Sequence, residues 1–349
     1  MADTKIKELI DRLNEEKHLS HEEWITLLTD FDADDMNYAA RLARNIADIH
    51  YGRDIYIRGI VEFSNYCRND CLYCGIRCSN KNVSRYRLTK EEITHCCDDG
   101  YGLGFRTFVL QSGEDRYYTI DVLSDIIADI KKSHPDCAVT LSIGELEKEE
   151  YRQLFDAGAD RYLLRQETAD EAHYGRLHPK SLSFSHRMKC LENLKEIGFQ
   201  TGCGFMAGSP FQTKENVAED MEFMCGFKPH MIGIGPFIPH KDTPFRDYPQ
   251  GTLENTLFYL SLCRIMLPKV LLPATTALGT INPKGREMGI LAGANVVMPN
   301  LSPVNVRKKY MLYDNKICTG DEAAECIRCM KTRIEAIGYQ VISDRGDAK

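Results

Sequence analysis

Three cysteines in one short polar segment constrain this chain more than any other feature of its sequence. Cys67, Cys71 and Cys74 form a C-x3-C-x2-C triplet directly after a strand-like segment, residues 55–63. Three thiolates at this spacing can hold three corners of a cubic iron–sulfur cluster, whereas ordinary electron-transfer clusters take four cysteines. The fourth iron would then be free to bind a small molecule. The triplet therefore predicts a cluster that takes part in chemistry.

A fourth cysteine nearby leaves two closed sites as alternatives. With Cys78 the segment becomes C-x3-C-x2-C-x3-C, which would complete a zinc knuckle or a four-cysteine cluster. We favour the open three-cysteine site, with Cys78 just outside it. The polar barrel interior expected from the strands has no use for a closed site.

Composition narrows the class of protein. The chain has 349 residues, and α/β barrels often reach this length as one domain. A net charge of −7 without a dense Lys/Arg tract argues against a nucleic-acid partner. The sequence has no apolar run of about 18 residues, which argues against a membrane span, and its first residues lack the apolar stretch of a secretory signal. Fourteen cysteines then indicate a reducing cytoplasm and metal ligation. Because oxygen destroys an exposed cluster, we expect an anaerobic bacterium as the host.

Short apolar strands alternate with amphipathic helices along most of the chain. After helices over residues 4–50, we expect eight strands, at residues 55–63, 107–111, 138–143, 162–165, 201–206, 231–237, 270–274 and 295–298. The helices expected between them cover residues 90–97, 120–132, 148–157, 186–197, 216–225, 253–267 and 285–291. Gly158, Gly198 and Gly293 each precede a strand, where the turn out of a helix takes a residue at positive φ.

This order predicts the α/β class and a complete (β/α)8 TIM barrel. Residues 1–52 would form an N-terminal helical segment, residues 53–300 the barrel, and residues 301–349 a C-terminal capping segment. A barrel of this type carries its active site at the carboxyl ends of its strands. The cysteine triplet follows the first strand and therefore lies at that end.

Charged residues within the strands indicate a polar interior. Because side chains alternate along a strand, the apolar face of residues 55–63 would meet the helices, and Arg58 and Glu62 would point into the lumen. Arg165 and Glu167 would do the same at the fourth strand. The alternative is a buried ion pair that fixes the strand register, but such pairs stabilise weakly. We favour a cavity that binds an anionic ligand, because buried charge is costly unless it has a use.

The triplet, with Tyr73 at the aromatic position before its last cysteine, resembles the loop of the radical S-adenosylmethionine superfamily. The resemblance implies a [4Fe-4S] cluster whose open iron binds the amino and carboxylate groups of S-adenosylmethionine. An electron passed into the sulfonium would cleave it to methionine and a 5′-deoxyadenosyl radical, so that the cofactors carry the hard chemistry.

Two segments suit S-adenosylmethionine. Residues 111–115 stand where the superfamily has a Gly-Gly-Glu-type motif that binds the cofactor's amino group, with Ser112 in place of the first glycine. Arg187 lies early on the fourth helix, where it can pair with the cofactor's carboxylate, although such a residue alone is more often a solvated charge. Residues 233–237 are glycine-rich but lack the context of a dinucleotide fingerprint. We expect them to be the sixth strand, with glycines that leave room for adenine or ribose.

The tail carries a second cysteine triplet, Cys318, Cys326 and Cys329, in a C-x7-C-x2-C arrangement. It can hold a second iron–sulfur cluster, or the three can be surface thiols without a function. The spacing alone does not decide whether catalysis needs such an accessory cluster.

Further motifs resemble the HydE family, the radical S-adenosylmethionine maturases of [FeFe]-hydrogenase. They are residues 60–77, 79–82, 85–87, 109–115, 161–165, 233–240, 273–277 and 279–280. The tail triplet also matches, so the resemblance runs from about the first strand to Cys329.

This resemblance implies a substrate, partners and site residues. The family's enzyme takes a small organometallic iron species, bearing carbon monoxide, cyanide and cysteine, from a partner maturase. The radical attacks the cysteine sulfur, and the iron unit passes on toward a scaffold maturase, while a ferredoxin or flavodoxin serves as reductant. By position, the residues that line the substrate cavity would be Arg58, Arg165, Thr275, Thr276, Tyr310 and Tyr313. Those that contact S-adenosylmethionine would be Tyr73, Gln111, Ser112, Glu167 and Arg187.

Three alternatives share some of these features. A mutase of the methylornithine-synthase type would keep the cysteine loop and the barrel. A biotin-synthase-like enzyme would need a second cluster inside the barrel, for which Cys203 on the fifth strand is the one obvious inward cysteine. An iron–sulfur carrier would explain the tail triplet, but it has no need of lumenal arginines.

Overall fold

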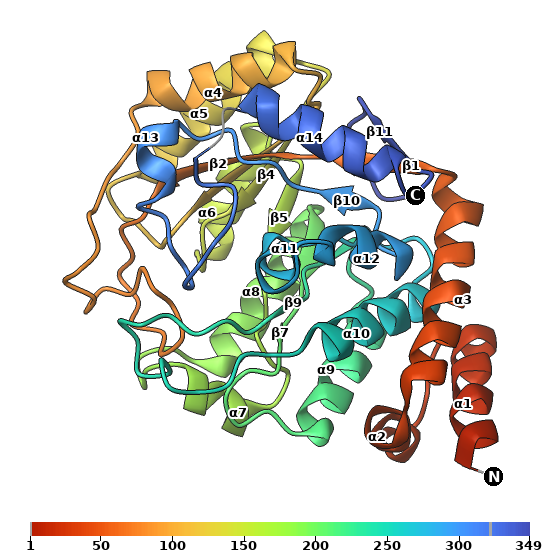
Figure 1. Ribbon diagram of the computed structural model, residues 1–349. Helices are drawn as coiled ribbons and strands as arrows, with labels where there is room; N and C mark the ends of the chain where they lie inside the picture. Colours follow the sequence, from red (N-terminus) through yellow and green to blue (C-terminus); the bar gives the residue numbers. More distant parts are fainter. Residues whose placement is uncertain (1, 321–322) are drawn as a thin grey trace.

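The computed structural model describes residues 2–320 and 323–349, with the side chains of residues 2–4 and 323–326 outside the description. The strands are β1 (Asp54–Ile57), β2 (Gly59–Ser64), β3 (Thr107–Ser112), β4 (Ala138–Ser142), β5 (Arg161–Leu163), β6 (Gln200–Cys203), β7 (Met206–Ala207), β8 (Met231–Ile232), β9 (Gly235–Pro236), β10 (Val296–Val297) and β11 (Gln340–Ile342). Helices lie outside the strands and surround them (Figure 1).

The helices are α1 (Ala2–Glu16), α2 (His21–Asp30), α3 (Ala33–Tyr51), α4 (Lys90–Gly102), α5 (Ile120–Ser133), α6 (Lys148–Asp156), α7 (Glu171–Leu177), α8 (Phe184–Ile197), α9 (Lys214–Phe227), α10 (Leu253–Met266), α11 (Thr276–Ile281), α12 (Gly285–Leu291), α13 (Val304–Arg307) and α14 (Ala323–Glu335). All seven helices expected between the strands are confirmed. Capping side chains determine where several of these helices begin. At the start of α4, for example, Thr89 and Glu92 form a reciprocal capping box. The sequence did not predict the short helices α7, α11 and α13.

Parallel pairing organises the strands. The main sheet has six strands in the order β2-β3-β4-β5-β6-β8, and β1 lies between β10 and β11 in a second sheet. Single bridges from Met231 to Leu271 and from Pro273 to Val296 run between β8 and β10. The parallel α/β class is therefore confirmed.

The expected first strand, residues 55–63, is divided into β1 and β2 by a break of one residue. β1 pairs with β10, whereas β2 pairs with β3. Arg58 lies at the break, where its backbone N–H donates to the carbonyl of Val297 at 3.0 Å. The residues after β10 continue alongside β2, where the backbone N–H of Ile60 donates to the carbonyl of Pro299 at 2.9 Å. The expected strand is therefore confirmed apart from this break.

Three later strands are also shorter than expected. Gly204, at φ +144°, separates β6 from β7, and a Cβ there would come within 2.2 Å of the carbonyl oxygen of Gly233. Residues 231–237 divide into β8 and β9, and residues 270–274 take part only through single bridges. By contrast, Gly158, Gly198 and Gly293 have φ values of +110°, +110° and +103°, which confirms the expected turns.

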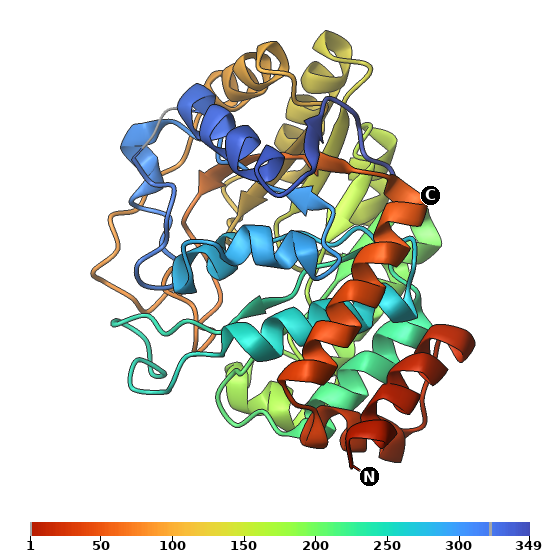
Figure 2. The ribbon, with the colours of Figure 1, turned by 45° about the vertical axis from the view of Figure 1, so that its right-hand side comes forward.

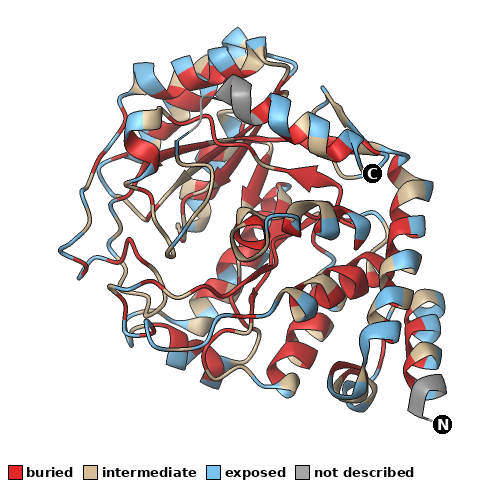
Figure 3. Ribbon diagram, viewed as in Figure 1, coloured by how far each residue is buried: buried red, intermediate tan, exposed pale blue. Residues whose placement is uncertain are grey.

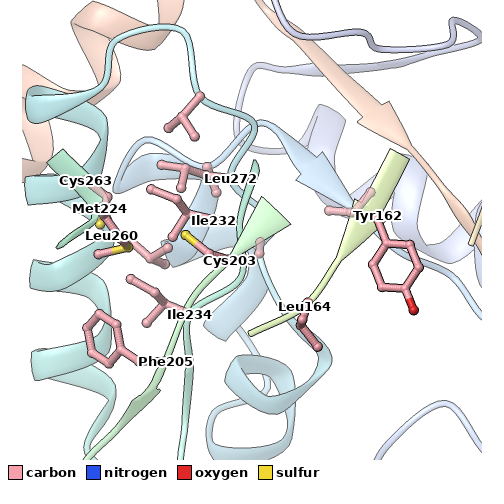
Figure 4. Packing of buried hydrophobic residues seen from close by; sticks show 14 of the residues in the cluster. Tyr162, Leu164, Cys203, Phe205, Met224, Ile232, Ile234, Leu260, Cys263 and Leu272 are labelled. Atoms are coloured by element: carbon pink, nitrogen blue, oxygen red, sulfur yellow. The ribbon is translucent and has the colours of Figure 1, made fainter. Parts of the chain in front are cut away.

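The core lies between the strands and the surrounding helices, with the strands almost wholly buried (Figure 3). Cys203 of β6 belongs to this outer core. Its side chain points toward Ile232, Leu260 and Cys263 (Figure 4). Because these neighbours come from β8 and from α10 on the outside, Cys203 does not face the lumen, and the expected inward orientation was wrong.

The C-terminal tail lies at the amino ends of the strands. The N-terminal helices pack against α9 and α10, and the C-terminus lies beside β1 (Figures 1 and 2). Asp347 near the C-terminus accepts hydrogen bonds from Arg161 at 2.6 Å and from Gln200 at 2.7 Å. The Arg161 side chain has no exposed surface, so the tail supplies the carboxylate that a buried guanidinium requires. Within the described ranges, no helix has the length and apolar character needed to cross a lipid bilayer.

We predict that Asp347→Ala destabilises the fold by roughly 2 kcal/mol, because it leaves Arg161 buried without a carboxylate while Asp347 itself is partly solvated. Burial alone would raise the pKa of Asp347, but hydrogen bonds from Arg345 and Gln200 and the charge of Arg161 hold it well below its ordinary value. The contribution of Asp347 is therefore present above about pH 4 and shrinks as the pH falls below that value.

Denaturant unfolding at pH 7 and at pH 3 measures this difference. Asp136→Ala, which removes an exposed pair with Arg106, is the control and should cost less than about 1 kcal/mol. Equal losses in the two variants at pH 7 would contradict the assigned role of the tail.

Candidate active site

The cysteine segment between β2 and α4 lies at the carboxyl end of the main sheet and packs against the loop after β3 and against the C-terminal tail. A Cβ on Gly75 would come within 2.2 Å of the carbonyl oxygen of Met311, and one on Gly113 within 2.3 Å of that of Tyr66. The backbone N–H of Gly75 donates to the carbonyl of Leu312 at 2.8 Å. The loop after β3 and the tail are thus held against the cysteines.

Cys67, Cys71 and Cys74 are all partly buried. Burial raises the pKa of each thiol, of Cys74 to about 12, and the neighbouring cysteines raise the values further. A bound iron would hold the three as thiolates, since metal binding releases the thiol protons. Three thiols on one segment that reach a polar sheet end are a donor set that fits an iron–sulfur cluster.

Cys78 is exposed, and its backbone N–H donates to the carbonyl of Asn69 at 2.9 Å. Among the residues that the structure describes, no three or more His, Cys, Asp or Glu side chains are gathered to bind a single metal ion.

Two ion pairs lie next to the cysteines, one beyond the end of β5 and one between the residues after β4 and α8. Arg165 and Glu167 are 3.0 Å apart, between Nη2 and Oε2. Arg187 donates through Nε to Glu145 and through Nη1 to the carbonyl of Arg165 at 2.7 Å. Glu167 has φ +66°, an uncommon conformation for a residue with a side chain. Such conformations cluster at functional sites.

These groups act on the cysteines electrostatically. Burial and the other two cysteines keep the pKa of Cys71 well above its ordinary value, while Arg187 lowers it and Glu167 raises it. The structure therefore brings together Cys71, Glu167 and Arg187. The sequence analysis missed the partner of Arg187, which is Glu145, a residue after β4 whose side chain is only 3% exposed. No motif or regular spacing in the sequence marks Glu145 as a site residue.

Tyr73 is held by His178. The ring of His178 is buried, and both of its nitrogens form hydrogen bonds. Nδ1 lies 3.0 Å from the carbonyl oxygen of Tyr174, and Nε2 lies 3.2 Å from the hydroxyl oxygen of Tyr73. Burial lowers the pKa of His178 to about 3, so its ring is neutral. Since a carbonyl can only accept, Nδ1 carries the proton and the Tyr73 hydroxyl donates to Nε2.

Gln111 and Ser112 are the last two residues of β3, directly before the loop that begins at Gly113. The Ser112 hydroxyl donates to the carbonyl of Gly113 at 2.7 Å, and Glu114 accepts from the backbone N–H of Glu145 at 3.0 Å. The side chain of Ser112 also lines a cavity of about 220 Å³ that reaches Glu145. The loop thus lies between the cysteine segment and the end of β4.

The remaining substrate-cavity candidates lie around the tail and α11. Thr275 caps α11, which begins at Thr276, and its hydroxyl lies 3.2 Å from where a Cβ on Gly235 would be. Gly235 therefore faces Thr275, and the expected room for adenine or ribose at residues 233–237 stays a prediction. Tyr310 and Tyr313 are buried, and burial raises the pKa of Tyr313 to about 12.

Glu62 has a partner that the sequence did not suggest. Its carboxylate pairs with Lys316 of the tail and accepts from Asn300 at 2.8 Å. Lys316 also donates to the carbonyl of Tyr310 at 3.0 Å. Glu62 is therefore neutralised by the tail and not by Arg58.

Arg58 does not lie with Arg165. Its guanidinium donates to the sulfur of Met231 at 3.0 Å and to the carbonyl of Gly346 at 3.2 Å. Burial lowers its pKa, and the charge of Arg161 lowers it further, while Asp347 acts against both. These neighbours place Arg58 beside the C-terminal tail at the amino ends of the strands. The expectation that Arg58 lines the substrate cavity was therefore wrong, because the C-terminal tail occupies the space around its guanidinium.

The tail cysteines are only partly described. Cys318 accepts a hydrogen bond from Arg286 at 3.2 Å, and Cys318 and Cys329 both line a cavity of about 400 Å³ beneath α14. The side chain of Cys326 lies outside the described residues. An accessory cluster on the triplet therefore stays a prediction.

Comparison with known proteins decides the family. Residues 61–224 match the Radical SAM superfamily. The chain is 47% identical over 309 residues to "[FeFe] hydrogenase maturase subunit HydE" of Thermotoga maritima, which covers 88% of each chain. The chain belongs to the HydE family of radical S-adenosylmethionine enzymes. The predicted family and enzyme class are thereby confirmed, and with them the [4Fe-4S] cluster and S-adenosylmethionine that the family implies. The iron–sulfur carrier is set aside.

Other relatives of this HydE-family chain share its fold. It is 28% identical over 341 residues to 3-methylornithine synthase of Methanosarcina barkeri, covering 97% of this chain and 95% of that one. The crystal structure of methylornithine synthase (PylB) superposes with a TM-score of 0.83 at 27% identity, over 95% of this chain and 97% of that chain. The architecture therefore does not separate maturase from mutase.

The buried pair of Glu145 and Arg187 yields a stability prediction. Glu145→Ala leaves the Arg187 guanidinium buried without a carboxylate, so we predict a loss of about 3–5 kcal/mol in the free energy of unfolding. Glu196→Ala, which removes an exposed pair with Lys148, is the matched control and should cost less than about 1 kcal/mol. Chemical unfolding of the two variants without added cofactor tests this, and a Glu145→Ala variant as stable as the control would refute it.

Proposed function

We propose that this HydE-family enzyme matures [FeFe]-hydrogenase by acting on a small organometallic iron precursor. The observation that carries the proposal is the meeting of Cys71 with two arginine–glutamate pairs at one sheet end, in a chain 47% identical to a hydrogenase maturase. The pairs supply both signs of charge in one buried place, which suits a ligand with ammonium, carboxylate and cyanide groups.

The cofactors fit this sheet end. Cys67, Cys71 and Cys74 would hold the [4Fe-4S] cluster, and Tyr73, Gln111, Ser112, Glu167 and Arg187 would contact S-adenosylmethionine. Bound together and given an electron by a ferredoxin or flavodoxin, they supply a 5′-deoxyadenosyl radical. Glu167 is the acceptor for an ammonium group, and Arg187, fixed by Glu145, is the cation for a carboxylate. His178 fixes the ring of Tyr73 beside the cysteines.

The substrate would lie deeper, against Arg165. We infer that the radical attacks the sulfur of a cysteine that binds an iron unit carrying carbon monoxide and cyanide. A partner maturase would deliver this species, and a scaffold maturase would receive the product. Thr275, Thr276, Tyr310 and Tyr313 line the other side of the cavity in this proposal. The guanidinium of Arg165 is paired on one side by Glu167, and its remaining donors can bind an anion.

Three further proposals concern the whole chain. The bridges at Leu271 and Pro273 support a complete eight-stranded barrel over residues 53–300, between a helical segment and a capping segment. The tail triplet would bind an accessory cluster that radical formation does not need. An anaerobic cytoplasm would be the setting.

The mutase remains the second candidate, because the PylB structure matches over nearly the whole chain. The maturase is preferred since the identity to the HydE relative is 47%, against 28% for 3-methylornithine synthase. Analysis of the reaction products for 3-methylornithine separates the two, because the maturase forms none.

Arg165→Leu tests the proposed cavity. We predict that it weakens substrate binding on the order of a hundredfold, because a bidentate charged contact is lost. Uncoupled release of 5′-deoxyadenosine should change little, since the cysteines remain. The measurement is in vitro maturation of hydrogenase beside 5′-deoxyadenosine release. Arg152→Leu, an exposed arginine on α6, is the control. Normal maturation by Arg165→Leu would show that the arginine is structural.

A further inference from the structure

One arginine of the cysteine segment has a role that neither the triplet nor the cofactor residues account for. Arg85 is half-buried, and its guanidinium donates to four backbone carbonyls. Nη1 reaches those of Asn65 and of Ile76, the latter at 2.7 Å. Nη2 reaches those of Arg77 at 2.7 Å and Asn80 at 3.2 Å.

These carbonyls lie on both sides of the triplet. Asn65 stands just before Cys67, whereas Ile76, Arg77 and Asn80 follow Cys74. One side chain therefore joins the entry and the exit of the segment that holds the three thiols. The planar fork of a guanidinium can make such a set of bonds, but a lysine ammonium cannot.

Arg85 also differs from its neighbours in charge balance. Arg68 pairs with Glu114, Arg77 with Asp70, and Arg87 with Asp115. Among the described residues, no carboxylate lies within ion-pair distance of Arg85. Carbonyl oxygens satisfy its hydrogen bonds but leave its positive charge uncompensated.

This charge acts at the cysteines. Nη1 of Arg85 lies 2.7 Å from the carbonyl oxygen of Ile76, two residues after Cys74, so the guanidinium is placed beside the segment that holds the thiols. A cluster held by three thiolates carries negative charge, and reduction adds to it. A nearby cation therefore favours the reduced form, since net charge and hydrogen bonding set the potential of such clusters.

We propose that Arg85 is a positioning residue of the cluster segment, and that its uncompensated charge raises the reduction potential of the cluster. The inference rests on the proposed ligation by Cys67, Cys71 and Cys74. It assigns Arg85 two separable effects: the hydrogen bonds retain the cluster, and the charge makes its reduction easier.

Three variants separate these effects after anaerobic reconstitution. Arg85→Gln removes both the positive charge and the guanidinium that makes the four hydrogen bonds. Arg85→Lys keeps the positive charge but not the guanidinium. Arg53→Gln makes the same charge change at the amino end of β1, where Arg53 donates to the carbonyl of Gly338. The readouts are iron release to a chelator and a potentiometric titration followed by electron paramagnetic resonance.

We expect Arg85→Gln to titrate at a more negative potential, with the ratio of reduced to oxidised cluster at a fixed potential falling roughly tenfold, which corresponds to 59 mV for one electron. Both Arg85 variants should release iron several-fold faster than the wild type. Arg85→Lys should keep a potential close to that of the wild type, and Arg53→Gln should match the wild type in both readouts.

A wild-type potential in Arg85→Gln, or wild-type iron release in Arg85→Lys, overturns the corresponding half of the proposal. If Arg85→Gln does not fold, the iron release of Arg85→Lys still decides the positioning role, and a shifted potential in that variant argues against the charge. Cys71→Ala distinguishes a failure of the proposed cysteine ligation from a failure of the Arg85 inference. Full retention of the cluster in it refutes the ligation and this inference together, whereas loss of iron beside an unchanged Arg85→Gln refutes the inference alone.

Discussion

Hydrogen bonds from side chains to backbone carbonyls hold the cysteine segment, and the whole site depends on them. Residues 65–86 contain no helix or strand, so the regular backbone hydrogen bonds of secondary structure do not fix the positions of the three thiols. Asn65 donates to the carbonyls of Ser84 and Lys309, and Asn80 donates to that of Gly75 at 2.7 Å. Arg85 adds four such bonds. The parallel sheet fixes where the segment starts, and these bonds fix where its sulfurs lie.

Buried charge is distributed over both ends of the strands, but with different partners. At the carboxyl ends, Arg165 and Glu167 pair beside the cysteines and leave donors for a ligand. At the amino ends, the tail accepts hydrogen bonds from Arg58 at the carbonyl of Gly346 and from Arg161 at the carboxylate of Asp347. The same kind of residue thus serves chemistry at one end and structure at the other. The available partner makes the difference, because a guanidinium already bonded to its own chain has little left for a substrate.

The sequence predicted what depends on local pattern and failed where distant segments meet. The cysteine spacing, the helices and the turn glycines follow from short stretches, and the structure agrees with the last two. Arg58 was misplaced because alternation shows which face a side chain takes but not which part of the chain covers it. The pair of Glu62 with Lys316 joins residues 254 positions apart, and no periodicity encodes such a contact. Glu145 was missed for the same reason, since its importance lies wholly in Arg187.

Counting iron and following its response to S-adenosylmethionine tests the central claim, an open cluster on three cysteines, most directly. Cys67, Cys71, Cys74 and Cys78 are each replaced by alanine and the proteins reconstituted anaerobically, with the tail triplet removed to leave one cluster. Wild type and Cys78→Ala should hold equal iron, and S-adenosylmethionine should change the electron paramagnetic resonance signal of both. The other three variants should lose the iron and the response. Loss of both in Cys78→Ala, or a wild-type signal in Cys71→Ala, would contradict the three-cysteine site.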